Sequence, residues 1–187
     1  MDIVLTIPGL GGSDAAHWQS FWEADRPNCR CVLGIDWNLP DKGAWLSALD
    51  NAIKACDTPP ILAAHSLGCL LAVHWALRMN SAPVKGALLV APADVDSRDH
   101  TPAETACFAP IPLGVLPFPA TLVASSNDPY CGLGRAQLFA TAWGADFVNT
   151  GERGHLNSDS HLGAWDDGWD VLGGVTTPNA ACSLEVS

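Results

Sequence analysis

The chain has few basic residues and no long apolar run. Of its 187 residues, 9 are Lys or Arg and 20 are Asp or Glu, which gives a formal net charge of -11 at pH 7. A chain this acidic repels nucleic-acid phosphates and anionic lipid surfaces. No apolar run approaches the roughly 20 residues that a transmembrane helix needs. The sequence therefore predicts neither a nucleic acid nor a membrane as a partner.

Signs of secretion and of metal binding are also lacking. Residues 1–8 have no basic segment before their five-residue apolar stretch, so we expect a strand there and not a signal peptide. The seven cysteines are odd in number and include no Cys-x-x-Cys pair. This pattern favours reduced thiols over a disulfide framework or a zinc site. We expect a cytoplasmic protein that binds no metal.

Short apolar runs alternate with helix-like segments along most of the chain. Strands that are apolar on both faces are typical of a buried parallel sheet with helices on each side. The sequence predicts an α/β fold, a three-layer αβα sandwich around a mostly parallel sheet of about six strands. We expect a single domain over 1–172 and a loose or disordered tail over 173–187. The expected strands are 3–8, 31–35, 61–64, 84–91, 120–125 and 146–149, and the expected helices are 15–24, 42–55, 67–79, 134–143 and 162–172.

Residues 94–119 interrupt this alternation. The segment holds five prolines and has no clear hydrophobic period. In α/β proteins, a long excursion of this kind at the carboxyl ends of the strands commonly covers a pocket. We expect it to form part of a substrate pocket.

The sharpest local signal lies at residues 61–68, which read ILAAHSLG. They predict a strand, a tight turn with Ser66 at its apex, and a following helix. Such a turn needs small residues two positions away on each side, which Ala64 and Gly68 supply, although the usual pattern has glycine at the first of them. The turn would expose the Ser66 hydroxyl at a helix N-terminus. We predict a nucleophilic serine; the alternative is a serine that only caps the helix.

A nucleophilic serine needs a base, and the chain has six histidines. His155 is the preferred candidate because it lies in a glycine-containing loop directly after the last predicted strand. His161, six residues later, is the main alternative. The candidates that are weaker by position are His65 inside the turn, His74 in the third predicted helix and His100 in the proline-rich segment.

The acid that orients the base is expected at a strand end between the serine and the histidine. Asp128 follows the fifth predicted strand. The chain order Ser66, Asp128, His155 is then the order found in α/β-hydrolase triads. Asp94 and Asp96, which follow the fourth predicted strand, are alternatives.

A glycine-rich loop follows the first predicted strand and reads PGLGGSD over 8–14. Its backbone N–H groups, first that of Leu10 and next that of Gly11, are expected to stabilise an oxyanion together with the N–H of Leu67. The alternative is a dinucleotide loop. Asp14 occupies the third glycine position of that pattern and would repel a pyrophosphate. We expect an oxyanion hole and no organic cofactor.

Eight tryptophans are many for this length, and we expect most of them in the core. Trp18 and Trp37 lie next to loops at predicted strand ends. They are the candidates to line an acyl pocket.

Six stretches occur in a fixed order: PGLGGS over 8–13 with His17 and Trp18, Asp36-Trp37, AHSLGC over 64–69, APAD over 91–94, SSNDPY over 125–130, and GHLN over 154–157 with Trp165. Together they resemble the small single-domain α/β-hydrolases related to retinoblastoma-binding protein 9, and particularly their bacterial members, over residues 3 to about 172. The resemblance implies a reduced hydrolase sheet without a cap domain, serine esterase activity, and a triad of Ser66, Asp128 and His155. No Leu-x-Cys-x-Glu motif is present, so we infer no protein partner.

The sequence thus predicts a serine hydrolase that cleaves small ester or thioester bonds through an acyl-enzyme. A small-molecule ester is the expected partner. One alternative is a catalytically idle hydrolase fold that binds a protein or a small ligand, and another is an acyltransferase that uses the same triad. A nucleophilic Cys69 or Cys131 is a minor alternative, because neither lies at the apex of the turn.

Overall fold

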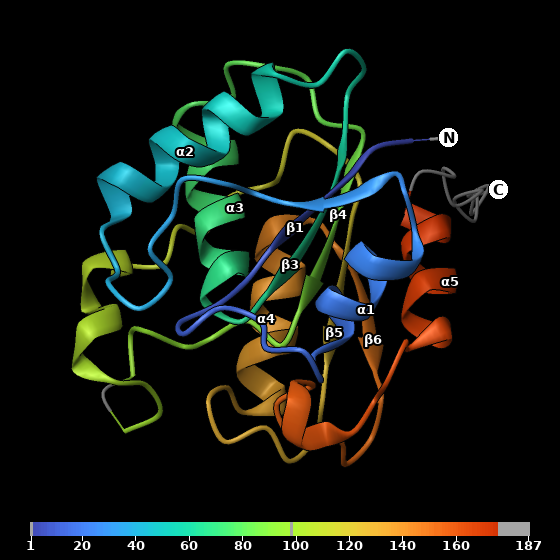
Figure 1. Cartoon of the computed structure of the whole chain (residues 1–187). Coiled ribbons are helices and arrows are strands. Elements are labelled where there is room, and N and C mark those ends of the chain that lie inside the picture. Colours follow the sequence, from blue (N-terminus) through green and yellow to red (C-terminus); the bar gives the residue numbers. More distant parts are fainter. Residues whose placement is uncertain (1, 98, 176–187) are drawn as a thin grey trace, which may run out of the picture.

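The computed structural model describes residues 2–97 and 99–175 and contains one parallel sheet in the order β2-β1-β3-β4-β5-β6 (Figure 1). Strand and helix alternate along the chain, as the sequence predicts. The strands are β1 (Val4–Ile7), β2 (Cys29–Cys31), β3 (Ile61–His65), β4 (Gly86–Val90), β5 (Ala120–Ala124) and β6 (Asp146–Asn149). The helices are α1 (Trp18–Asp25), α2 (Lys42–Lys54), α3 (Leu67–Arg78), α4 (Leu133–Trp143) and α5 (Asp166–Val175), with the 3-10 segments η1 (Ala103–Phe108) and η2 (Ser158–Ser160).

Alternate residues of each strand belong to two separate hydrophobic clusters. In β3, Leu62 and Ala64 pack with residues of α2, α3 and α4, whereas Ile61 and Ala63 pack with residues of α1 and α5. Figure 1 shows α2, α3 and α4 on one side of the strands and α1 and α5 on the other. This arrangement confirms the predicted three-layer αβα sandwich.

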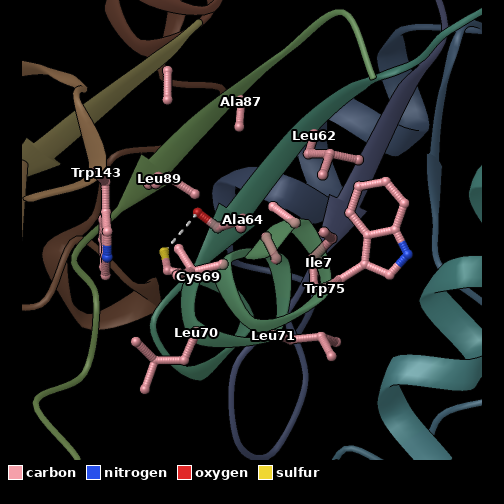
Figure 2. Close-up of a cluster of buried hydrophobic side chains, with 14 of the residues drawn as sticks. Ile7, Leu62, Ala64, Cys69, Leu70, Leu71, Trp75, Ala87, Leu89 and Trp143 are labelled. Carbon is pink, nitrogen blue, oxygen red and sulfur yellow. Dashed lines mark hydrogen bonds between the residues drawn. The ribbon is translucent and has the colours of Figure 1, made fainter. Parts of the chain in front are cut away.

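Helix α3 is the most deeply buried helix because it packs on β1 and β3 and is also covered by α2 and η1. Ten of its 12 residues are buried, so it is apolar on nearly every side and not only on one face. Figure 2 shows Cys69 and Trp75 on the side of this helix that faces the strands, and Leu70 and Leu71 on the side away from them. The indole of Trp75 donates a hydrogen bond to the buried carboxylate of Asp50 in α2 (2.9 Å). The helix that begins directly after Ser66 is thereby fixed in the core.

The strand predicted over 31–35 is displaced towards the N-terminus. Its observed residues, Cys29–Cys31, pair with β1, and the backbone leaves the sheet afterwards through Gly34, whose φ is 81°. A short strand at the edge of the sheet has only one neighbour, so apolar pattern alone does not fix its register.

Helix α1 begins three residues later than predicted. His17 is its N-cap residue, and the imidazole Nδ1 accepts a hydrogen bond from the N–H of Gln19 (3.2 Å). Asp14, a favourable capping residue by type, instead accepts from the N–H of Ala16 in the turn before the helix (2.8 Å).

Helix α5 continues to Val175, so 173–175 are helical and do not belong to a loose tail. The rest of the predicted tail, 176–187, lies outside the described residues. Within the part of the chain that the structure describes, no helix is long and apolar enough to cross a membrane.

We expect Gly68→Ala and Gly134→Ala to have opposite effects, although each is the second residue of its helix. A Cβ at Gly68 would lie 2.2 Å from the carbonyl oxygen of Ile7, whereas a Cβ at Gly134 meets nothing within 4 Å. Gly68→Ala should lower the free energy of unfolding by about 3 kcal/mol or more. Gly134→Ala should raise it by about 0.5 kcal/mol. Denaturant unfolding of both variants tests this; equal effects would contradict it.

Candidate active site

Ser66 occupies a strained turn between β3 and α3. Its φ and ψ are 54° and -121°, a left-handed conformation that non-glycine residues rarely adopt, and its N–H donates to the carbonyl of Val90 (3.0 Å). The turn lies directly against the first loop, where a Cβ at Gly9 would be 2.8 Å from the Cβ of Ser66. Glycine at this position lets the loop backbone approach the serine hydroxyl.

The structure brings Ser66, His155 and Asp128 together. His155 Nε2 lies 2.9 Å from Ser66 Oγ, and His155 Nδ1 lies 2.9 Å and 3.0 Å from the two oxygens of Asp128. An ionised carboxylate only accepts hydrogen bonds, so Nδ1 carries the proton and Nε2 is the acceptor for the serine hydroxyl. Asp128 Oδ1 also accepts from the N–H of Tyr130 (2.9 Å), which fixes the orientation of the carboxylate.

The alternative bases and acids lie elsewhere. His161 is exposed, in a left-handed conformation after η2. Asp94 and Asp96 both pair with Arg135 of α4, at 3.1 Å and 3.0 Å, and so anchor the base of the 94–119 segment. The remaining candidate histidines are bonded to backbone carbonyls: His65 to His155, His74 to Phe108, and His100 to Pro129.

Hydrogen bonds from several distant segments hold the loop that carries His155. Asn127 Oδ1 accepts from the N–H of Gly154 (2.7 Å), and the indole of Trp18 donates to the carbonyl of Leu156 (3.0 Å). His65 Nε2 donates to the carbonyl of His155 itself (2.9 Å). The base is therefore held on both sides by groups from β3, α1 and the loop after β5, all distant in sequence.

Two residues beside Ser66 have backbone N–H groups with no acceptor among the described residues. Leu10 and Leu67 both line the cavity beside Ser66, and neither donates its N–H to another of the described residues. Gly11, the third predicted donor, donates its N–H to the carbonyl of Trp37 (2.9 Å) and is not available to an oxyanion.

A cavity of about 250 Å³ opens above Ser66. One wall consists of residues of the 94–119 segment, Thr101, Pro102 and Thr105, as expected for an excursion that covers a pocket. Further lining residues come from the β1–α1 loop and from the loop after His155. The lining residues that sequence reasoning did not single out are Gly12, Asp14, His17, Ala93, Tyr130, Asn157, Ser158 and Asp159. Their positions in loops after the carboxyl ends of strands are the signal that marks them.

Neither Trp18 nor Trp37 lines this cavity, contrary to the sequence-based expectation. Trp18 is 1 % exposed and its ring packs edge-on against Trp22 below the histidine loop. Trp37 packs edge-on against Trp45 behind the glycine-rich loop, at a ring distance of 5.0 Å. Both are large apolar rings next to a polar site, and each gains more from burial in a hydrophobic cluster than from exposure to the cavity.

Comparison with known proteins assigns the chain to a family. A family model described as serine hydrolase matches residues 4–174. The chain belongs to the serine hydrolase family. As a member of it, the protein is an ester-hydrolysing enzyme with an α/β-hydrolase fold.

Solved structures agree with this assignment. A YdeN-like hydrolase from Pectobacterium atrosepticum is 33 % identical, with a TM-score of 0.82 over 93 % of this chain and 90 % of that one. The ydeN gene product from B. subtilis is 18 % identical, with a TM-score of 0.71 over 94 % and 98 %. The type II thioesterase BorB from the borrelidin biosynthetic cluster is 18 % identical, with a TM-score of 0.61 over 92 % and 88 %. The comparison with curated protein sequences gave no match.

The two cysteines near the site are unsuited to nucleophilic attack. Burial raises the pKa of Cys69 well above its ordinary value. Its thiol contacts the carbonyls of Ala64 and Val90, and the contact with Ala64 is drawn in Figure 2. Burial raises the pKa of Cys131 to about 12. Both thiols stay protonated, and a protonated thiol is a poor nucleophile.

Three histidine rings of this serine hydrolase lie in contact beside the serine, the first pair edge-on and the second tilted. The ring centroids of His17 and His65 are 4.7 Å apart, and those of His65 and His155 are 4.8 Å apart. Burial lowers the pKa of His17 to about 4 and that of His65 well below its ordinary value. Both rings are therefore neutral near pH 7, so His155 can become protonated without two adjacent cations.

We expect the protein to lose stability as the pH falls from 6.5 towards 4. In that range the unfolded chain protonates His17 and the folded chain does not, so acidification favours unfolding. The free energy of unfolding should fall by up to about 1.4 kcal/mol per pH unit for each such histidine. Urea unfolding between pH 7.5 and 5 measures it. His17→Asn keeps an N-cap acceptor and removes the titrating imidazole. In this variant the free energy of unfolding should depend less steeply on pH, by the contribution of one proton; an unchanged pH dependence would contradict this.

Proposed function

We propose that the protein is a carboxylesterase-like hydrolase that cleaves small ester or thioester bonds through Ser66, His155 and Asp128. The observation that carries the proposal is the continuous hydrogen-bonded chain from Ser66 Oγ through both ring nitrogens of His155 to the Asp128 carboxylate, with every step between 2.9 Å and 3.0 Å. This is the geometry that a serine, a base and an orienting acid need for acyl transfer.

The chemistry follows from the position of each proton. His155 Nε2 takes the hydroxyl proton as Ser66 Oγ attacks the carbonyl carbon, and a tetrahedral intermediate forms. The Asp128 carboxylate stabilises the imidazolium that results. His155 then gives the proton to the leaving alcohol or thiol, and the acyl group remains on Ser66. A water molecule, activated by His155 in the same way, attacks this acyl-enzyme and releases the acid.

The negative charge of the intermediate needs donors that are already in place. The N–H groups of Leu10 and Leu67 are free of other described partners and lie at the cavity next to Ser66. Leu67 is also the first residue of α3, so the positive end of the helix dipole adds to the stabilisation. We assign these two N–H groups to the oxyanion hole and leave Gly11 out.

The cavity supports small substrates. Its volume of about 250 Å³ is below that of ordinary drug-sized pockets, and the 94–119 segment closes one side of it. We therefore propose short acyl groups in both ester and thioester substrates. From the sequence we also propose that the protein is cytoplasmic, that its partner is a small-molecule ester, and that it is related to retinoblastoma-binding protein 9.

We expect a fluorophosphonate probe to label the purified wild-type protein and not Ser66→Ala. Ser66→Ala and His155→Ala should each lower kcat/KM for p-nitrophenyl butyrate by about three orders of magnitude or more, because the triad acts as a unit. Asp128→Asn should do the same without loss of fold.

His161→Asn is the matched control for His155→Ala. Asparagine tolerates the left-handed backbone at this exposed position, where φ is 51°. This variant should be labelled and should turn over the ester like the wild type. A wild type that is folded but not labelled would contradict the hydrolase mechanism and favour the catalytically idle, ligand-binding alternative. Transfer of the acyl group to an added alcohol in preference to water would favour the acyltransferase.

We expect neutral thioesters to be better substrates than coenzyme A thioesters. Asp14 and Asp159 are exposed at the cavity, and no Lys or Arg lies among its described lining residues. These carboxylates repel a polyanionic leaving group. The kcat/KM ratio of butyryl-coenzyme A to butyryl-N-acetylcysteamine should rise about two- to fivefold in Asp159→Asn at low salt and less at high salt. A ratio that does not change would contradict the effect of charge.

A further inference from the structure

The acid of the triad depends on a single backbone N–H for its orientation. Among the described residues, the Asp128 carboxylate has two partners, the imidazole of His155 and the N–H of Tyr130, which donates to Oδ1 (2.9 Å). His155 is the group that Asp128 has to orient, so it cannot also be the fixed point that holds the carboxylate. The peptide group between Pro129 and Tyr130, which carries this N–H, therefore determines the direction of the carboxylate.

The oxygen of the same peptide group is bonded to His100. Nδ1 of His100 lies 3.0 Å from the carbonyl oxygen of Pro129, and no other described residue donates to this oxygen. A carbonyl oxygen only accepts hydrogen bonds, so Nδ1 carries a proton and is the donor. Because a peptide group is planar and moves as a unit, a donor that holds its oxygen also fixes the direction of its N–H. His100 thus acts on the N–H of Tyr130 without touching it.

This hydrogen bond also changes the strength of the next one. Hydrogen bonds in a chain polarise one another, so an amide whose oxygen accepts a hydrogen bond is a stronger N–H donor. The chain starts at His100, passes through the peptide group and ends on the carboxylate of Asp128. A stronger donor favours the ionised carboxylate, which is the form that stabilises the imidazolium of His155.

His100 belongs to the 94–119 segment, which holds Tyr130 at a second place. The backbone N–H of Asp94, the first residue of the segment, donates to the carbonyl of Tyr130 (3.0 Å). Both peptide groups of Tyr130 are therefore bonded to this segment, and the ring of Tyr130 packs edge-on against that of His155, with centroids 4.4 Å apart. Other residues of the segment line the substrate cavity. The segment that borders the substrate is thus bonded directly to the loop that carries the acid.

We propose that His100 is a positioning residue that orients Asp128 through the peptide group between Pro129 and Tyr130. The imidazole is exposed and is not among the residues that line the cavity, so it acts on the rate of the chemical step and not on substrate binding. This inference rests on the proposed esterase function and adds a residue that acts through the acid of the triad.

The test compares His100→Leu, which removes the donor, with His100→Asn, which keeps one. The side-chain nitrogen of asparagine is bonded to Cγ, as Nδ1 of histidine is, and carries N–H groups. We expect His100→Leu to lower kcat for p-nitrophenyl butyrate about three- to tenfold, the value of about one hydrogen bond. KM should stay within about twofold, because acylation and deacylation use the same triad. The rate of labelling by a fluorophosphonate should fall by the same factor as kcat, and His100→Asn should restore both rates to within about twofold of the wild type.

A double-mutant cycle with Asp128→Ala tests whether the effect passes through the acid. In that background His100→Leu should change kcat by less than about twofold, since the carboxylate that His100 orients is gone. An equal loss in both backgrounds, a change in KM in place of kcat, a His100→Asn as slow as His100→Leu, or a His100→Leu as fast as the wild type would each overturn the inference. A wild type that no fluorophosphonate labels would instead overturn the esterase function on which the inference rests.

Discussion

The close contact between the nucleophile turn and the first strand is the constraint on which the site depends. Gly68 lies so near the backbone of Ile7 and Pro8 that a Cβ would come within 2.5 Å of both carbonyl oxygens. This approach sets α3 against β1 and puts the N–H of Leu67 and the glycine-rich loop at the same cavity. Strain at Ser66 is tolerated because the buried helix that follows it cannot move.

The polar groups of the site are arranged around the proton that His155 takes from Ser66 and gives to the leaving group. Asp128 and the carbonyl-bonded His65 hold His155 from two directions, and its neighbouring rings are kept neutral by burial. A charge that appears on His155 therefore has one carboxylate partner and no competing cation. Preorganisation of this kind lets the protein stabilise the charge without rearrangement.

Sequence reasoning reached the fold because the strands are buried on both faces and the helices between them have clear apolar periods. The residues at strand ends, Ser66, Asp128 and His155, were also within its reach, since the carboxyl ends of parallel strands meet at one edge of the sheet. It failed for Trp18 and Trp37. Both residues are next to loops that line the cavity, but their position in the chain does not determine the orientation of the ring. Trp18 packs into one hydrophobic cluster and Trp37 against the other.

The sequence by itself determined the three layers of the αβα sandwich, the turn at Ser66 and the chain order of the serine, the acid and the base, because these depend on local pattern and on spacing. Tertiary structure alone decided which N–H groups remain free, since Gly11 loses its own to Trp37. It also made His17, which falls within the predicted helix, the N-cap residue of α1, with a buried Nε2 that has no partner among the described residues. Hydrogen-bond satisfaction is settled between segments far apart in the chain, and periodicity carries no information about it.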